Sequence, residues 1–246
     1  MPPEWLDAAR ASVPEYIAAH GDRDFLVPDA ADETNTPAHE LVATPELRAL
    51  FASAAEAGWP RVSQSGKIRS GLTVRTGPAD TQGPAMLFHY DASVVTMVVP
   101  IYIPDGQVGD SAELVTLPNK RPFRRFLIMH VIDKLATHNS FYRRRFAKRI
   151  FRDPERHIVN MKPGNAYVFW GYRTLHGNLP CAANMLRSTL VLQYGEVHRK
   201  SPALSLGRAI GRRKVRRLQI AAVQAADPSA AGLGAELQHG FLITDW

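Results

Sequence analysis

Short β-rich pieces, separated by Gly, Pro, Asn and Asp, occupy the chain from about residue 65 to residue 195. Val, Ile, Thr and aromatic residues are enriched in these pieces, and such residues fit the pleated, half-buried surface of a sheet. About eight short strands at this spacing are typical of a closed barrel or a two-sheet jelly roll. The pieces are GKIRSGLTVRTG, AMLFHYD, SVVTMVVPIYIP, AELVTLP, HIVNMKPG, NAYVFWG, YRTLHGN and LRSTLVLQYG. The sequence therefore predicts a mainly β core with turns at these breakers.

Helical patterns flank this core. In TPELRALFASAAEAGWP (44–60), Thr44 can cap a helix, Pro45 fits its first turn and Gly58 ends it. We expect one domain in three parts: an N-terminal helical segment (1–64), the β core (65–195) with an Arg-rich, partly helical insert (about 119–152), and a C-terminal helical segment (196–246).

Composition limits the classes of protein that remain. No apolar stretch approaches the roughly 18 to 20 residues that span a bilayer, and the first ten residues lack the pattern of a secretory signal. Cys181 is the single cysteine, which excludes an intrachain disulfide and argues strongly against a Cys-based zinc site. We therefore expect a cytoplasmic protein without a membrane partner.

The net charge of +7 is unevenly distributed. Basic clusters of this kind can bind nucleic acid or phosphate, and they can equally be the solvated faces of helices, which we rank first. They also favour an anionic substrate. The clusters are RPFRRF (121–126), FYRRRFAKRIFR (141–152) and GRAIGRRKVRR (207–217).

His89 and Asp91 lie at the start of a run that otherwise predicts a buried strand, LFHYDASVVTMVVPIYIP (87–104). In a strand, residues two apart point to the same face, so the two side chains would stand next to each other. An imidazole and a carboxylate inside a sheet are costly unless they bind something. A metal ion, a hydrogen-bond partner, or each other would meet this requirement.

Two later residues complete a pattern. His176 lies in YRTLHGN, and Arg187 follows on the next predicted strand. Two imidazoles and one carboxylate on one face of an octahedron leave three open positions, as in non-haem Fe(II) oxygenases. An arginine beyond them can bind the far carboxylate of a 2-keto dicarboxylic acid through a bidentate, charge-assisted pair.

With HYD (89–91), HGN (176–178) and RST (187–189) in this order, the chain resembles the Fe(II)/2-oxoglutarate-dependent dioxygenases, most of all their phytanoyl-CoA dioxygenase-like branch. The resemblance covers about residues 65 to 195. It implies a double-stranded β-helix, the cupin-like jelly roll, which agrees with the strand pattern.

The resemblance also implies roles for individual residues. His89, Asp91 and His176 would be the Fe(II) ligands. Arg187 would bind the distal carboxylate of the co-substrate 2-oxoglutarate, with the Thr189 hydroxyl as a helper. The retained Asp91 argues against the chloride-accepting variant of the family, which lacks this carboxylate. Two further residues on predicted barrel strands are candidates for co-substrate or substrate contacts, with core-edge or surface roles as the alternative: Arg75 and Tyr102.

One departure limits what carries over from the family. The phytanoyl-CoA dioxygenase-like branch has a P-G-S-H-like turn where AELVTLPNKRP (112–122) has Asn119 and Lys120. Coenzyme A thioesters are therefore not carried over as substrates.

The resemblance predicts an enzyme that uses Fe(II), O₂ and 2-oxoglutarate to hydroxylate an unactivated C–H bond of a small molecule, releasing succinate and CO₂. We expect a natural-product or amino-acid-like substrate. Desaturation, cyclisation and epoxidation use the same ligands, so the outcome stays open, as does the oligomeric state. The alternatives are a basic β-sandwich that binds nucleic acid or protein, an oxygenase acting on a macromolecule, and a metal-binding barrel without 2-oxoglutarate turnover.

Overall fold

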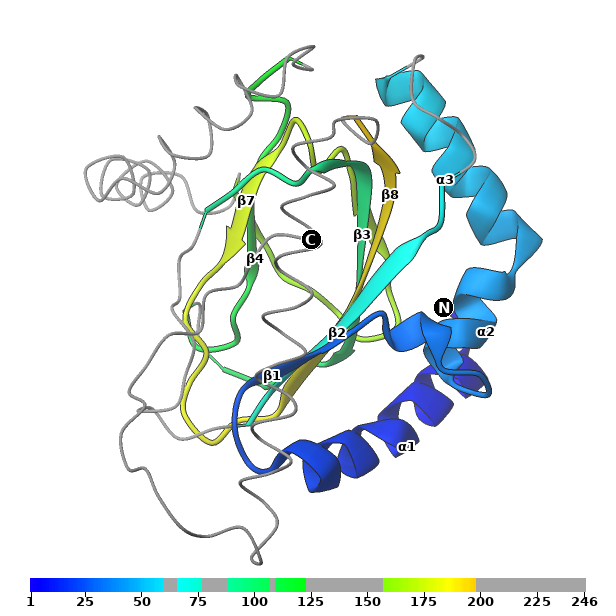
Figure 1. The fold of residues 1–246 in the computed structure, drawn as a ribbon. Coiled ribbons are helices and arrows are strands. Elements are labelled where there is room, and N and C mark those ends of the chain that lie inside the picture. The colour runs from blue at the N-terminus through cyan, green and yellow to red at the C-terminus, as the bar shows by residue number, and fades with distance from the viewer. Residues whose placement is uncertain (60–65, 77–87, 107–108, 123–156, 198–246) are drawn as a thin grey trace, which may run out of the picture. The chain divides into compact units, whose positions relative to one another are not determined.

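The computed structural model describes residues 1–59, 66–76, 88–106, 109–122 and 157–197 (Figure 1). Within these ranges the chain forms three α-helices, a short 3₁₀ helix and eight strands. The helices are α1 (Pro3–His20), η1 (Ala30–Asp32), α2 (Pro37–Ala43) and α3 (Pro45–Gly58). The strands are β1 (Phe25–Pro28), β2 (Arg69–Arg75), β3 (Ser93–Tyr102), β4 (Leu114–Leu117), β5 (Ile158–Val159), β6 (Tyr167–Phe169), β7 (Leu175–Asn178) and β8 (Arg187–Glu196).

The strands form two antiparallel sheets. One sheet has the order β1-β2-β8-β3-β6 and the other the order β5-β4-β7. Figure 1 shows β4 and β7 facing β3 and β8 across the interior of the fold. The predicted mainly β, jelly-roll class with flanking helices is confirmed.

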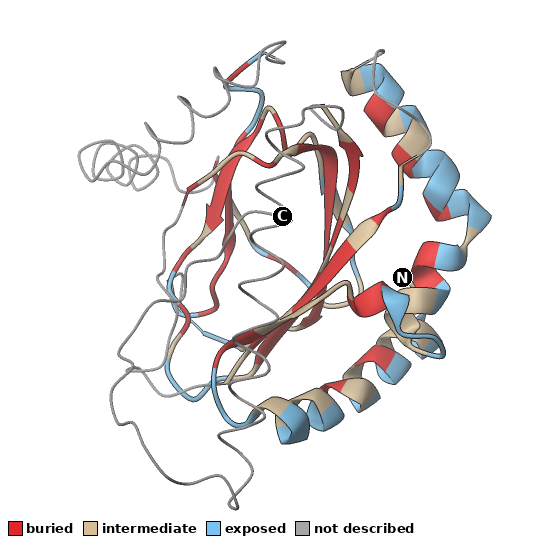
Figure 2. Ribbon diagram, in the orientation of Figure 1, coloured by how far each residue is buried: buried red, intermediate tan, exposed pale blue. Residues whose placement is uncertain are grey.

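The long strands β3 and β8 form the centre of the larger sheet and have buried side chains on both faces (Figure 2). Their outward-facing residues, such as Val95 and Leu190, pack in one apolar cluster with Val13 of α1 and Phe51 of α3. The sheet needs this helical cover because an apolar face must be buried against another element. Helix α3 begins at Pro45 with Thr44 in the N-cap position, as predicted, but the Thr44 hydroxyl donates to the carbonyl of Leu41 (2.8 Å) and does not cap α3.

The inner faces of the two sheets contribute a second cluster. Val98 of β3, Leu114 of β4 and Met161 are buried there, with Phe169 and Val191 packed against them. Side chains of both sheets therefore meet in one interior, as the alternation of strand residues requires.

Packing against β4 also determines which side chains of β7 point toward the interior. Val115 and Leu117 of β4 pack with Leu175 of β7 in a third cluster, distinct from the interior one. Because neighbouring strand residues point to opposite faces, His176 turns away from this cluster and toward the interior. There it meets the ring of Phe169 edge-on, with ring centroids 4.9 Å apart.

The described part of the segment 1–64 contains α1, η1, α2 and α3, and also β1, which pairs with β2. The division of the chain into three parts stays a prediction. Most of the insert (about 119–152) and nearly all of the C-terminal segment (196–246) lie outside the described residues. No helix in the described ranges is long and apolar enough to cross a membrane.

Candidate metal centre

His89 and Asp91 are held by backbone hydrogen bonds to the segment that carries His176. The amide of His89 donates to the carbonyl of His176 (2.9 Å), and the amide of His176 donates back to the carbonyl of His89 (3.0 Å). The amide of Asp91 donates to the carbonyl of Gly171 (3.1 Å). The expectation that both residues lie on one regular strand is wrong, because β3 begins only at Ser93 and His89 forms an isolated bridge. The two side chains converge nevertheless.

The three predicted ligand residues form one compact cluster. Asp91 Oδ1 lies 3.4 Å from His89 Nε2, and Asp91 Oδ2 lies 3.5 Å from His176 Nε2. One nitrogen or oxygen atom from each residue lies within 4.8 Å of the others. Metal–nitrogen and metal–oxygen bonds of about 2 Å bring the ligands of one ion to such separations. The donor set of two imidazoles and one carboxylate therefore fits a divalent metal ion.

The exposure of the three side chains differs. Asp91 and His176 are buried, whereas the His89 side chain is 37% exposed. The cluster is thus enclosed around Asp91 and reachable from the side of His89. A metal ion held in a site of this form could accept further ligands in its open coordination positions.

The protonation states suit metal binding. Burial acts to raise the pKa of Asp91, but electrostatic interaction with His176, the hydrogen bond and electrostatic interaction with His89 and the hydrogen bond from Thr96 lower it well below its ordinary value. Burial lowers the pKa of His176, outweighing the neighbouring carboxylate of Asp91. An ionised carboxylate and a neutral imidazole are the forms that bind metal.

His176 is held in one orientation. Its Nδ1 lies 3.0 Å from the carbonyl oxygen of Thr174, which can only accept. The proton of the neutral ring therefore resides on Nδ1, and Nε2 presents its lone pair toward Asp91. A hydrogen bond of this kind is the usual support for a metal-bound histidine.

Asp91 has two supports that the sequence analysis missed. The buried hydroxyl of Thr96, on β3, donates to Asp91 Oδ2. A Cβ atom on Gly171 would overlap Asp91 Oδ2 and Thr96 Oγ1. A threonine within the apolar run SVVTMVV is a signal that could have been found, whereas nothing in the sequence marks Gly171.

Arg187 lies on the inner face of β8, next to Thr189. Because Leu190 packs in the outer cluster, the alternation of strand residues turns Arg187 and Thr189 inward. Arg187 is 3% exposed, and its Nη1 donates to Thr189 Oγ1 over 3.4 Å. Its Nε has no hydrogen-bond partner among the described residues. Burial and the charge of Arg75 lower the pKa of Arg187 to about 10.

Arg75 and Tyr102 have different surroundings. Arg75 is the direct pairing partner of Arg187 across β2 and β8, and its Nε lies 3.8 Å from Asp24 Oδ2. Tyr102 packs against the outer cluster, with the guanidinium of Arg10 5.5 Å from its ring centroid. The binding roles of both residues stay predictions.

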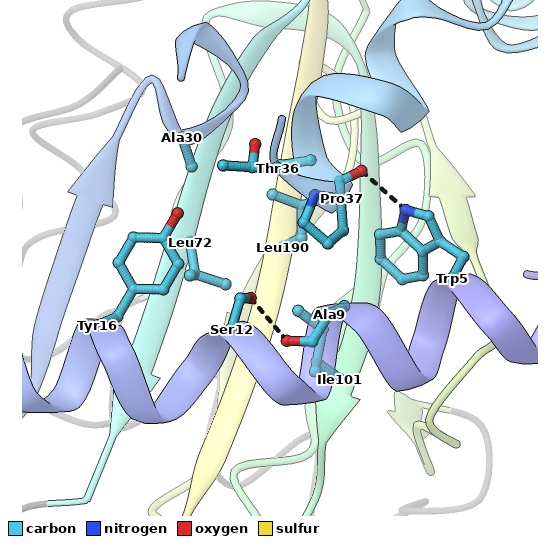
Figure 3. Close-up of a pocket in the computed structure, with 11 residues that line it drawn as sticks. Trp5, Ala9, Ser12, Tyr16, Ala30, Thr36, Pro37, Leu72, Ile101 and Leu190 are labelled. Atoms are coloured by element: carbon cyan, nitrogen blue, oxygen red, sulfur yellow. Dashed lines mark hydrogen bonds between the residues drawn. The ribbon is translucent and has the colours of Figure 1, made fainter. Parts of the chain in front are cut away.

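A small apolar cavity lies on the opposite side of the larger sheet, between α1, α2 and the outer sides of β2, β3 and β8 (Figure 3). Trp5 bounds it and donates from Nε1 to the carbonyl of Pro37 (2.8 Å). The cavity shares no residue with the His89–Asp91–His176 cluster.

Three solved structures are similar to this chain at low sequence identity. AviO1 from Streptomyces viridochromogenes Tue57 is 16% identical, with 82% of this chain and 87% of that chain covered and a TM-score of 0.50. SnoN, a non-heme alpha ketoglutarate dependent epimerase from nogalamycin biosynthesis, is 13% identical, with 79% and 75% covered and a TM-score of 0.49. A Pseudomonas putida prolyl-4-hydroxylase is 15% identical, with 80% and 88% covered and a TM-score of 0.44.

No protein-family model and no curated protein matches the chain. The likeness to AviO1 shows a shared fold. The jelly roll implied by the resemblance to the Fe(II)/2-oxoglutarate-dependent dioxygenases is confirmed, and the His-Asp-His cluster that it implies is present.

Proposed function

We propose that the chain is a non-haem Fe(II)- and 2-oxoglutarate-dependent oxygenase that acts on a small molecule. The observation that carries the proposal is the convergence of His89, Asp91 and His176 within 4.8 Å. Two imidazoles and a carboxylate form the facial ligand set of this class, and they leave room for a co-substrate and dioxygen.

The metal-binding roles follow from the atoms that face one another. His89 Nε2, His176 Nε2 and Asp91 Oδ1 would hold Fe(II). Bound Fe(II) supplies the activation of dioxygen that couples decarboxylation of 2-oxoglutarate to oxidation of the substrate. Thr174 keeps the His176 proton on Nδ1, and the hydroxyl of Thr96 donates to Asp91 Oδ2 and orients the carboxylate. The ring of Phe169 packs edge-on against His176 and covers that side of the site.

Arg187 would bind the distal carboxylate of 2-oxoglutarate. Its guanidinium is buried, and its Nε has no partner in the described part of the chain, so a carboxylate would satisfy both its charge and its fork of donors. Thr189 accepts from Arg187, which leaves its own hydroxyl proton free to reach the same carboxylate. Arg75 would add a second positive charge near Arg187.

We infer hydroxylation of an unactivated C–H bond as the reaction, with a natural-product or amino-acid-like substrate. Succinate and CO₂ would be the products of the co-substrate. The net charge of +7 favours an anionic substrate. A basic protein that binds nucleic acid is the competing proposal, and its affinity would fall steeply with salt concentration.

The test is anaerobic absorbance on adding Fe(II) and then 2-oxoglutarate to metal-free protein. We expect a visible metal-to-ligand charge-transfer band in the wild type, its loss in His176→Ala, and its weakening in Arg187→Ala. Arg69→Ala is a matched control, because Arg69 pairs with Glu196 (3.2 Å) in the same sheet. Fe(II) binding without a band at high 2-oxoglutarate would refute the co-substrate, and absence of Fe(II) binding would refute the metal centre.

A further inference from the structure

Arg121 is enclosed by two aromatic rings next to the candidate metal centre. Its guanidinium carbon lies 4.1 Å from the ring centroid of Tyr90 and 4.2 Å from that of Tyr172. Arg121 is 4% exposed and Tyr172 is fully buried. Arg121 belongs to the basic cluster RPFRRF (121–126). The burial of Arg121 does not fit the interpretation of this cluster as a solvated helix face.

The two rings belong to the two segments that carry the metal ligands. Tyr90 stands between His89 and Asp91. Tyr172 follows Gly171, whose carbonyl accepts from the amide of Asp91, and it precedes His176 by one short turn. Arg121 therefore connects the segment that carries two ligands to the segment that carries the third.

Hydrogen bonds fix Arg121 to one of these segments. Its Nε donates to the carbonyl of Tyr172 (2.6 Å), and its amide donates to the carbonyl of Arg173 (3.4 Å). Arg173 Nε donates back to the carbonyl of Arg121 (3.2 Å). With its position set in this way, the guanidinium is a rigid surface against which the ring of Tyr90 can stack.

The segment of His89 and Asp91 needs such a restraint. It precedes β3, and within the described residues its ladder pairing is limited to the single bridge between His89 and His176. Burying an arginine is also unfavourable, because its charge loses its hydration. Apolar side chains could fill the space between the two rings without that cost, so packing alone does not explain the arginine.

We propose that Arg121 is a positioning residue, which acts through Tyr90 to hold His89 and Asp91 in register with His176 for metal binding. The inference rests on the proposed metal centre. A guanidinium over an aromatic face is attracted by the ring's quadrupole, most strongly when both groups are desolvated, and here the guanidinium acts on both rings at once.

The test is Co(II) binding to metal-free protein under anaerobic conditions, followed by the visible absorption of the bound ion. Arg121→Met removes the charge, the planar surface and the hydrogen bond from Nε to Tyr172 but keeps an unbranched apolar stem. We expect roughly 10- to 100-fold weaker Co(II) binding, the usual effect of losing a residue that orients metal ligands, together with a changed absorption spectrum. Tyr90→Leu should have the same effect, and the double variant should be no weaker than either single one.

The matched control is Arg10→Met. Arg10 also lies over an aromatic ring, that of Tyr102, and donates from Nε to the carbonyl of Ile101 (3.3 Å), but on the outer side of the larger sheet. We expect wild-type Co(II) affinity in this variant, whatever its melting temperature. If Arg10→Met weakened Co(II) binding as much as Arg121→Met, the effect of Arg121 would be a general effect of packing, and the inference would be overturned.

The outcomes separate the inference from the proposed function. If the wild type binds neither Co(II) nor Fe(II), the metal centre itself fails. If the wild type binds and folded Arg121→Met binds equally well with an unchanged spectrum, the positioning role fails alone. If Arg121→Met does not fold, Co(II) binding by Tyr90→Phe and Tyr90→Leu tests the inference instead. Tyr90→Phe keeps the stacked ring and should bind as the wild type, whereas equal binding by Tyr90→Leu would overturn the inference.

Discussion

Gly171 lies directly against the carboxylate of Asp91, so closely that a Cβ atom on Gly171 would stand 3.0 Å from Asp91 Cγ and overlap Asp91 Oδ2. The same Cβ would overlap the hydroxyl oxygen of Thr96. A buried carboxylate and a β-strand threonine have little freedom to move apart. The position of the carboxylate thus depends on the absence of a side chain at residue 171.

Gly171→Ala should therefore displace Asp91. We expect at least about tenfold weaker Fe(II) or Co(II) binding and a loss of roughly 1 to 3 kcal/mol in the free energy of unfolding from overpacking. Metal titration and urea unfolding measure the two effects. Gly71→Ala is the control, because its Cβ would meet only the end of a flexible side chain, Leu26 Cδ1, at 3.3 Å. Wild-type metal affinity in Gly171→Ala would contradict the prediction.

Thr96→Val tests the hydrogen bond to Asp91 while conserving the shape of the side chain. Without the hydroxyl, Asp91 Oδ2 loses a buried donor, and leaving a buried acceptor unpaired costs about 1 to 3 kcal/mol. We expect lower stability of the metal-free protein in urea and weaker Co(II) binding. Thr96→Ser keeps the donor and should lie close to the wild type in both measurements. Identical behaviour of the Val and Ser variants would show that the hydroxyl is not needed.

The buried thiol of Cys181 should react slowly. Cys181 is 5% exposed, and burial raises the pKa of its thiol above the ordinary value, so less of the reactive thiolate is present at a given pH. Titration with a chromogenic disulfide reagent at pH 8 should be more than about tenfold slower for the folded protein than in denaturant. Equal rates would mean that the strand pairing at Ser111 and Cys181 opens readily.

The sequence indicated which residues come together at the candidate metal centre better than how they are held there. His89, Asp91 and His176 could be proposed because their order and residue types carry the signal. Their convergence, however, depends on the bridge between His89 and His176, a long-range contact that spacing along the chain does not reveal. Two supporting features were missed for the same reason: the close approach of Gly171 to Asp91, and the stacking of Arg121 on Tyr90. Strand β1 was missed because four residues are too few to show a period.

Arg187 should lower the free energy of unfolding of the protein, and binding of 2-oxoglutarate should restore it. A cation whose pKa is lowered in the folded state, here to about 10 by burial and by Arg75, binds its proton less tightly there than in the unfolded chain. The charged form therefore costs stability throughout the range below pH 10, and stability rises as the pH passes from about 10 toward the ordinary value. Arg187→Met removes this cost, so metal-free Arg187→Met should be more stable than the wild type by roughly 1 to 3 kcal/mol.

Arg187→Met should also abolish the stabilisation of the folded protein by 2-oxoglutarate. In the Fe(II)-loaded wild type under anaerobic conditions, 2-oxoglutarate should raise the melting temperature, because a ligand that binds only the folded state stabilises it. In Arg187→Met this rise should be absent or need about tenfold to a hundredfold more 2-oxoglutarate, the effect of losing a charge-assisted hydrogen bond. Arg69→Met, which breaks an ion pair with Glu196 in the same sheet, should keep the rise and gain no stability. A destabilised Arg187→Met that still responds to 2-oxoglutarate would mean that Arg187 is a structural residue and that the co-substrate binds elsewhere.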